Sequence, residues 1–259
     1  ALPISDMNFF SIALLGTAHG DPTRERYNSS ALLEIPSGDA WLIDAGTPAL
    51  ATLIRGGFDL ARLRGVFITH MHEDHFGGLP DIIKFQAKYR TERELTRIWL
   101  PEQAAIRGMK DFMALAHRPV PESLIRFDVL EPGLIGLLHG LSVRAVPTEH
   151  ASNEGRDFPS FALEFTAPDG RRILFTGDLS YDFHDFPAGT GADMAFCELT
   201  HYNLAHALPT LAKERFGRLI FNHVGNQWHG SEAEKRFREM TRDLPYPCVI
   251  AHDGDRFSC

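Results

Sequence analysis

The run ITHMHEDHFGG at residues 68–78 holds the densest group of side chains that could do chemistry. Within six residues it brings together three imidazoles and a carboxylate, from His70, His72, Asp74 and His75. Neutral imidazole nitrogens and carboxylate oxygens are ligands that suit Zn²⁺, Mn²⁺ or Fe. A helix would spread these side chains around its axis, whereas a loop at a strand end can turn all of them toward one point. The run therefore predicts a metal site.

Further candidate ligands stand where later strands are expected to end. His150 ends the run VPTEH, Asp178 ends ILFTGD, and His252 follows PCVIA. Together with the first group they make five histidines and two aspartates, which is enough for two metal ions with one aspartate as a bridge. Two such ions can polarise a substrate, bind a departing oxygen and generate hydroxide at neutral pH. Each of these three later residues, considered alone, is explained equally well as an ordinary polar residue in a loop.

Apolar runs and helical patterns alternate in both halves of the chain, as expected for sheets covered by helices. Strands are expected at Phe9–Leu15, Ala31–Ile35, Trp41–Ile43, Gly65–Thr69, Ile98–Leu100, Leu141–Val146, Phe161–Phe165, Arg172–Thr176, Met194–Leu199, Arg218–Asn222 and Cys248–Ala251. Helices are expected at Thr47–Arg55, Leu79–Tyr89, Glu102–Ala116, Leu204–Phe216, and from a Ser231–Glu234 capping box to Arg242. Residues 117–133 are rich in Pro and Gly and predict loop and edge structure. No segment has linker composition, so residues 1–259 are predicted to form one domain with two similar halves.

The composition excludes several classes of protein. Hydrophobic residues make up 44% of the 259 residues and charged residues 23%, which allows a large core and argues against disorder. A net charge of -8 argues against a strongly basic nucleic-acid binder. Three cysteines without a CxxC pair exclude a thiolate zinc site. No apolar run reaches the ~18 residues of a membrane span, and no basic segment precedes the first apolar run, so a cytoplasmic protein is expected.

With these residues in place, the sequence resembles the metallo-β-lactamase superfamily of hydrolases. The signature of that superfamily is HxHxDH, which residues 70–75 match, and the resemblance runs from about Ala13 to about Asp253. It implies an α/β protein with a four-layer αββα sandwich. It also implies two divalent metal ions, Zn²⁺ first, with Mn²⁺ or Fe as alternatives.

The resemblance also implies how the ligands divide between the two metals. The first metal would be held by His70, His72 and His150, and the second by Asp74, His75 and His252, with Asp178 as the bridging carboxylate. Asp44, in WLIDAG, matches a buried aspartate that supports the histidine loop in this superfamily.

Within the superfamily the sequence is most similar to ribonuclease Z-type phosphodiesterases. Its opening loop GTAHGDPTRERYNSSALLEI, the run CELT at 197–200 and the run FNHVG at 221–225 resemble runs of that family. The resemblance implies a metal-bound hydroxide, oriented by Asp74, that attacks phosphorus. It also implies that Glu198 and His223 act together to deliver a proton to the leaving oxygen.

The chain departs from ribonuclease Z in one region that bears on its substrate. Only residues 151–172 separate His150 from the ILFTGD strand, which leaves no room for the long basic arm that grips transfer RNA in that family. The expected substrate is therefore a small-molecule or short nucleotide phosphodiester and not transfer RNA. Whether the chain forms a homodimer stays open at this point.

Two other functions remain open from the sequence. Sister branches of the superfamily hydrolyse lactones and thioesters with the same metals, and a metal-binding protein without catalysis is the other alternative. A di-iron module is disfavoured, because His72 stands where such relatives carry Glu and no flavin domain is present. His201 and His229 are further candidates for the cleft, whereas Asn28 fits a turn former better than a phosphate contact.

Overall fold

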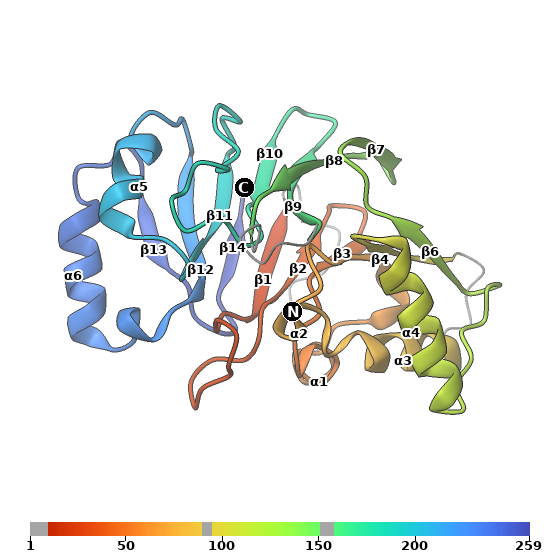
Figure 1. Cartoon of the computed structure of the whole chain (residues 1–259). Coiled ribbons are helices and arrows are strands. Elements are labelled where there is room, and N and C mark those ends of the chain that lie inside the picture. The colour runs from red at the N-terminus through yellow and green to blue at the C-terminus, as the bar shows by residue number, and fades with distance from the viewer. Residues whose placement is uncertain (1–9, 90–94, 151–157) are drawn as a thin grey trace. The chain divides into compact units, whose positions relative to one another are not determined.

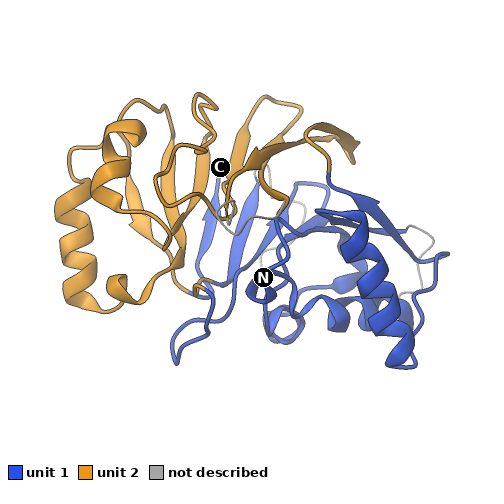
Figure 2. Cartoon of the chain, viewed as in Figure 1, with its two compact units in different colours: residues 1–16, 20–130, 253–259 blue, residues 17–19, 131–252 orange. Residues whose placement is uncertain are grey.

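The computed structural model describes residues 10–89, 95–150 and 158–259 (Figure 1). The described residues divide into two compact units, each with one sheet (Figure 2). Unit 1 comprises Ala1–Gly16, Gly20–Leu130 and Asp253–Cys259, and unit 2 comprises Thr17–His19 and Glu131–His252. The expectation of one domain over residues 1–259 stays a prediction.

The sheet of unit 1 has the strand order β14-β1-β2-β3-β4-β5-β6. Its strands are β1 (Ser11–Gly16), β2 (Ser30–Glu34), β3 (Ala40–Ile43), β4 (Leu63–Phe67), β5 (Thr96–Leu100), β6 (Ile125–Val129) and β14 (Arg256–Ser258). Strands β3 to β6 run parallel, and the pairs β14-β1, β1-β2 and β2-β3 are antiparallel. The parallel strands therefore end at a common edge, which is where the functional residues of α/β sheets are usually found.

The helices of unit 1 supply the apolar surface that the sheet needs. They are α1 (Ala49–Arg55), the one-turn helix α2 (Glu73–Phe76), α3 (Leu79–Tyr89) and α4 (Gln103–Leu115), with a short 3₁₀ segment at Leu60–Arg62. Sheet residues such as Leu42 and Val66 share one buried cluster with Leu53 of α1, Ile82 of α3 and Met109 of α4. This buried apolar area fixes the sheet against its helices and holds the strand ends in place.

Unit 2 contains a second sheet, with the strand order β13-β12-β11-β10-β9-β8-β7. Its strands are β7 (Gly133–Leu138), β8 (Leu141–Thr148), β9 (Ser160–Thr166), β10 (Arg172–Phe175), β11 (Met194–Leu199), β12 (Arg218–Val224) and β13 (Cys248–Ile250). Strands β10 to β13 are parallel, and β7 to β10 are antiparallel. Both sheets thus pass from antiparallel to parallel pairing.

Two helices cover one face of the unit 2 sheet, α5 (Leu204–Leu211) and α6 (Ser231–Thr241), beside the 3₁₀ segment Asn226–Trp228. The buried cluster on this face joins Leu174 of β10 and Phe221 of β12 to Leu211 of α5 and Phe237 of α6. Polar side chains of β10, β11 and β12 therefore lie at the strand ends or on the opposite face.

Most predicted elements are present with shifted ends, and the predicted helix Leu79–Tyr89 and strand Met194–Leu199 match the structure. Phe9, the first residue of one expected strand, lies outside the described residues. The helix expected at Leu204–Phe216 ends at Leu211, two residues after Pro209. Strands β7 and β14 were not predicted. None of the helices in the described ranges has the length and apolar character that crossing a bilayer requires.

Two local expectations are wrong. The HxHxDH run is not entirely a loop, because residues 73–76 form the single helical turn α2. The Ser231–Glu234 capping box is absent, because Ser231 is already helical and Gly230, at a φ of 84°, occupies the N-cap position without a side-chain bond. A glycine suits this left-handed conformation, which side chains rarely adopt.

Candidate metal centre

The histidine motif of unit 1 follows the carboxyl end of β4. His70 is fully buried, and its Nε2 lies 3.0 Å from Nδ1 of His72, the N-cap residue of α2. His75 lies on α2, with its ring centroid 4.1 Å from that of His70 and its Nε2 3.3 Å from Oδ2 of Asp74. The strand end and the helical turn together gather the three imidazoles and the carboxylate, as the sequence predicts.

Asp44, one residue after β3, holds this motif in position. It is 4% exposed and has a φ of 56°, a conformation that is uncommon outside glycine and that turns the chain sharply. Its carboxylate accepts hydrogen bonds from the backbone N–H of Thr69, at 2.8 Å, and from the Thr69 hydroxyl. The contact that the resemblance implied for Asp44 is therefore present.

The same carboxylate fixes the proton of His75. Nδ1 of His75 lies 2.7 Å from Oδ2 of Asp44. An ionised carboxylate only accepts hydrogen bonds, so Nδ1 must carry the proton and donate. The lone pair of the imidazole is then on Nε2, the atom that lies beside Asp74. Carboxylates orient metal-binding histidines in the same way in many metalloproteins.

Glycines allow the backbone to pack closely around the motif. Gly46 follows β3 by three residues, and a Cβ atom there would lie 2.2 Å from the carbonyl oxygen of Asp74. The N–H of Gly78, just after α2, donates to the carbonyl oxygen of Ala45 at 2.7 Å, and a Cβ on Gly78 would lie 2.8 Å from that oxygen. Any larger residue at either position would push the histidine loop away from β3.

Unit 2 holds a second cluster, centred on Asp178. Three imidazole nitrogens surround Oδ2 of Asp178, which is 2% exposed: Nε2 of His223 at 3.5 Å, Nε2 of His150 at 3.7 Å, and Nδ1 of His201 at 3.7 Å. These residues follow β8, β10 and β11 or lie on β12, so residues far apart in the sequence meet at one oxygen. The sequence predicted the meeting of His150 and Asp178, which this geometry contains.

The spacing in this cluster fits a cation. Two ligands that each bind one tetrahedral Zn²⁺ at about 2.0–2.2 Å lie roughly 3.3–3.6 Å apart. The N···O separations around Asp178 fall at or just beyond this spacing, and they are longer than ordinary hydrogen bonds. Asp178, His201 and His223 form one such group of ligand atoms within unit 2. The donor set and its geometry therefore fit a divalent metal.

His223 reaches this cluster through an unusual backbone conformation. It lies near the end of β12 with a φ of 47°, and its side chain is 2% exposed. The Thr200 hydroxyl donates to its carbonyl oxygen, which ties β12 to the end of β11. Backbone strain of this kind persists where the surrounding structure over-determines it, and such residues are concentrated at functional sites.

Glu198 lies in the same region and is 1% exposed. Its carboxylate accepts hydrogen bonds from the backbone N–H groups of Leu179, Thr200 and His201. Its Oε1 also lies 3.0 Å from Nδ1 of His201. The partner expected for Glu198 was His223, but His201 takes that place, because His223 turns its ring to Asp178.

His252 is not among the residues that gather around Asp178 in the described chain. Its Nε2 lies 3.0 Å from Oε1 of Glu234 on α6, and its side chain is 48% exposed. The sequence could not separate His252 from His223, since both stand near the end of a strand in the parallel half of the sheet. His201 was treated only as a cleft residue, although its position three residues after Glu198 could have indicated the pair.

Other polar candidates have structural roles. The side-chain amide of Asn28 donates to the carbonyl oxygen of Gly20 at 3.0 Å, and its oxygen accepts from Thr47 at 3.1 Å, as expected for a turn former. Nε2 of His229 lies 3.1 Å from the carbonyl oxygen of Val224. Cys197 is fully buried in the core, and burial raises the pKa of its thiol far above the ordinary value.

Comparisons with known proteins decide the family. The family model described as Anti-Pycsar protein Apyc1 matches residues 10–242. The chain belongs to the Anti-Pycsar protein Apyc1 family. It is 28% identical over 229 residues to the Apyc1 protein of Bacillus phage 010DV004, which covers 79% of this chain and 85% of that protein.

The other similarities connect this chain to ribonuclease Z and to the metallo-β-lactamase fold. The chain is 21% identical over 302 residues to ribonuclease Z of Macrococcus caseolyticus, which covers 93% of this chain and 97% of that one. The metallo-β-lactamase fold protein YhfI of Bacillus subtilis superposes with a TM-score of 0.76 at 18% identity, over 96% of this chain and 99% of YhfI. The predicted superfamily and its α/β sandwich fold are confirmed. The fold and the His/Asp clusters support a metal-dependent hydrolase.

Proposed function

We propose that this chain is a dinuclear metal-dependent phosphodiesterase that acts on small-molecule or short nucleotide phosphodiesters. The observation that carries the proposal is the approach of Nε2 of His223 and Nε2 of His150, at 3.5 and 3.7 Å, to one oxygen of buried Asp178. Similarity to ribonuclease Z supports phosphodiesters as the substrate class. The absence of a long insertion at residues 151–172 argues for substrates smaller than transfer RNA.

The proposed ligands come from both motifs. We assign His70, His72 and His150 to one metal, Asp74, His75 and His223 to the other, and Asp178 to both. His223 replaces His252 in this assignment, because His223 faces Asp178 and His252 faces Glu234. Zn²⁺ is the first candidate, with Mn²⁺ or Fe as alternatives for the same donors. When bound, the metals would polarise the phosphoryl group and lower the pKa of water.

The residues of the chain would then orient the attacking water and deliver one proton to the leaving group. Asp74 would accept a hydrogen bond from the attacking water and thereby orient it toward phosphorus. His201 would donate to the leaving oxygen in its protonated form: Glu198 accepts the Nδ1 proton, the Nε2 proton passes to the leaving oxygen, and the ring ends neutral. A sugar alkoxide is a poor leaving group, so a proton donor of this kind contributes typically 10²–10⁴-fold to the rate.

Leaving groups of different basicity test this assignment. The experiment measures bound metal and turnover on the same sample, with bis(p-nitrophenyl) phosphate and with cyclic or linear dinucleotides as substrates. Nitrophenolate leaves without protonation, so His201→Ala should lower the rate on nucleotides by about 10²–10⁴-fold and the nitrophenyl rate much less. Asp178→Ala should lose both metal and turnover. His206→Ala, at an exposed position on α5, is the matched control and should change neither.

The outcomes separate the rival functions. Two metals with turnover of lactones or thioesters, and none of phosphodiesters, would replace the proposal with an acyl hydrolase. Two metals without any turnover would indicate a metal-binding protein. Full activity of Asp178→Ala would refute the two-metal assignment itself. A homodimer remains a separate proposal that light scattering on the same sample can test.

A further inference from the structure

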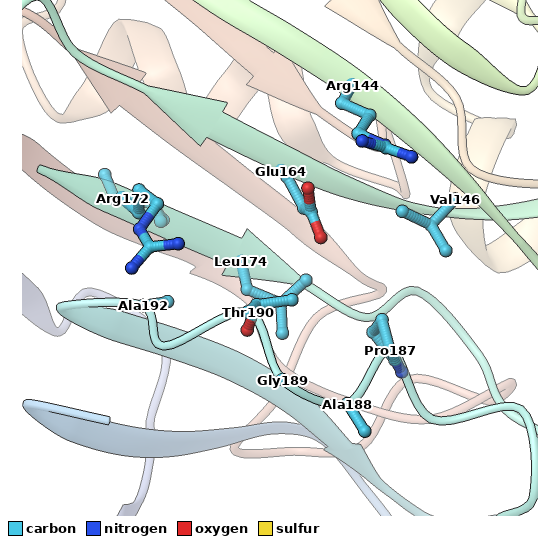
Figure 3. A pocket seen from close by; sticks show the side chains of 11 residues that line it. Arg144, Val146, Glu164, Arg172, Leu174, Pro187, Ala188, Gly189, Thr190 and Ala192 are labelled. Carbon is cyan, nitrogen blue, oxygen red and sulfur yellow. The ribbon is translucent and has the colours of Figure 1, made fainter. Parts of the chain in front are cut away.

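A cavity lies in unit 2, and its lining includes none of the residues gathered around Asp178 (Figure 3). Its volume is about 370 Å³, within the range of small-molecule sites. Its lining comes from β8, β9 and β10 and from the loop of residues 187–192. The charged side chains of the lining are Arg144, Glu164 and Arg172. In Figure 3, Glu164 lies between the two arginines.

The strand register explains why these charges share one face. Arg144 of β8 pairs with Glu164 of β9, and Glu164 pairs with Leu174 of β10. Directly opposite residues in antiparallel strands point to the same side of the sheet. Leu174 lies in the cluster that α5 and α6 cover, so the charged positions continue the same face beyond those helices. The cavity thus occupies the part of this face that is lined by charged side chains.

The charges on this face are not neutralised by one another. A cross-strand Arg–Glu pair on a solvated sheet would ordinarily approach to ion-pair distance. Among the residues that the structure describes, no ion pair within 4.0 Å is recorded for Arg144, Glu164 or Arg172. Two guanidinium groups and one carboxylate therefore line the cavity with an excess of one positive charge.

The loop that forms the opposite wall is held rigidly. The N–H of Gly189 donates to both carboxylate oxygens of Glu214, at 3.0 and 2.9 Å, and Glu214 is 7% exposed. Gly191 has a φ of 58°, and a Cβ there would lie 3.1 Å from a terminal nitrogen of Arg172. The glycine therefore lets the loop approach the guanidinium closely. A wall fixed in this way lowers the entropy that a ligand would lose on binding.

We propose that this cavity binds a nucleoside monophosphate at a site separate from the metal centre. The arginines would hold the phosphate, since a guanidinium matches phosphate oxygens with two parallel N–H bonds. Glu164 would accept N–H bonds from the base, because an ionised carboxylate only accepts. Val146 and Leu174 offer apolar contact to the sugar and base. A phosphate carries about -1.5 to -2 charges, which suits the positive excess better than a zwitterionic amino acid would. This proposal is argued from the cavity alone and does not depend on the proposed phosphodiesterase activity.

Calorimetric titration of the metal-loaded chain with AMP, GMP, CMP and UMP tests the proposal. At least one of them should show a saturable site that Arg144→Met and Arg172→Met each weaken about tenfold or more, since a lost charge-assisted hydrogen bond typically costs that much. Methionine keeps the apolar length of the stem and removes the charge. Glu164→Gln should change which base binds best. Arg171→Met is the matched control, because the neighbouring Arg171 pairs with Asp169 and does not line the cavity.

The titration also separates this site from product binding at the metals. Binding there would respond to Asp178→Asn and not to the arginine variants, and that pattern alone would overturn the proposal. Saturable binding of free amino acids with no response to nucleotides would overturn the ligand class. Equal weakening by Arg171→Met would show a general charge effect and would also overturn it. Melting temperatures close to that of the wild type would show that each variant is folded.

Discussion

Asp44→Asn is the most informative single substitution in unit 1, because it keeps the shape of the side chain and changes its hydrogen bonding and charge. The two carboxylate oxygens accept from different donors: Oδ1 from the N–H of Thr69 at 2.8 Å, and Oδ2 from Nδ1 of His75 at 2.7 Å. An asparagine offers only one oxygen, so its NH₂ group must face one of these two donors. If the NH₂ faces His75, the ring must accept at Nδ1 and carry its proton on Nε2.

That tautomer cannot use Nε2 as a metal ligand. Removal of such a supporting carboxylate typically lowers metal affinity 10–100-fold, which corresponds to about 1.4–2.7 kcal/mol. If the NH₂ faces Thr69 instead, a buried N–H loses its acceptor, and the metal-free protein loses about 1–3 kcal/mol of unfolding free energy. Asp44 is 4% exposed, so water does not replace the lost bond. Each orientation therefore has a measurable cost, and the two costs appear in different assays.

The assays are competition for Zn²⁺ with a chromophoric chelator and urea unfolding of the metal-free protein. Asp59→Asn is the control, because Asp59 caps the 3₁₀ segment Leu60–Arg62 and asparagine caps as well as aspartate. The control should match the wild type in both assays. Wild-type metal affinity together with wild-type stability in Asp44→Asn would refute the argument that this carboxylate sets the tautomer of His75.

Three further predictions concern other residues. His252→Ala should leave metal affinity within about twofold, whereas His223→Ala should lower it about tenfold or more in the same chelator assay, and the reverse order would restore His252 as the ligand. Burial raises the pKa of the Cys197 thiol, so iodoacetamide at pH 8 should modify Cys197 only after unfolding. Rapid modification of Cys197 itself in the native protein would contradict its placement in the core. Hydrogen bonds to Asp182 and Glu149 raise the pKa of exposed His184, so any stabilisation from this group is complete at low pH and is lost as the pH rises through the raised value. Asp182→Asn should bring that pKa, followed by NMR, back toward about 6.5.

The sequence predicted one half of the candidate site well and the other half less well. The HxHxDH motif is local, so its spacing alone brings its four side chains together, and Asp44 is tied to it directly. The ligands of unit 2 come from separate strands, and their approach depends on sheet order and backbone angles. His223 faces Asp178 through a left-handed backbone conformation, which the sequence does not reveal because only a few per cent of non-glycine residues adopt it.

The position of Cys197 shows why the imidazole that contacts Glu198 comes from His201 and not from the residue directly before Glu198. Successive side chains on a strand alternate between the two faces of a sheet. On β11, Cys197 shares the face of Ala195 and Leu199, which packs against α5 and α6, and Glu198 therefore points to the other face. A histidine at position 197 of this chain would enter the apolar core beside Tyr202, whose hydroxyl lies 3.3 Å from the sulfur of Cys197.

An imidazole that contacts Glu198 must instead come from a residue after β11, where the chain turns and side chains no longer alternate between the two faces of the sheet. The turn at Thr200 provides this, because Oε2 of Glu198 accepts from the N–H groups of Thr200 and His201 and so folds the chain back over its own carboxylate. His201 is thereby brought to Oε1 of Glu198, at 3.0 Å, and to Asp178 at 3.7 Å. The carboxylate that orients the imidazole also shapes the turn that delivers it. Removal of Glu198 should therefore displace His201 as well as leave its proton unfixed, so that His201→Ala is the cleaner test of proton donation.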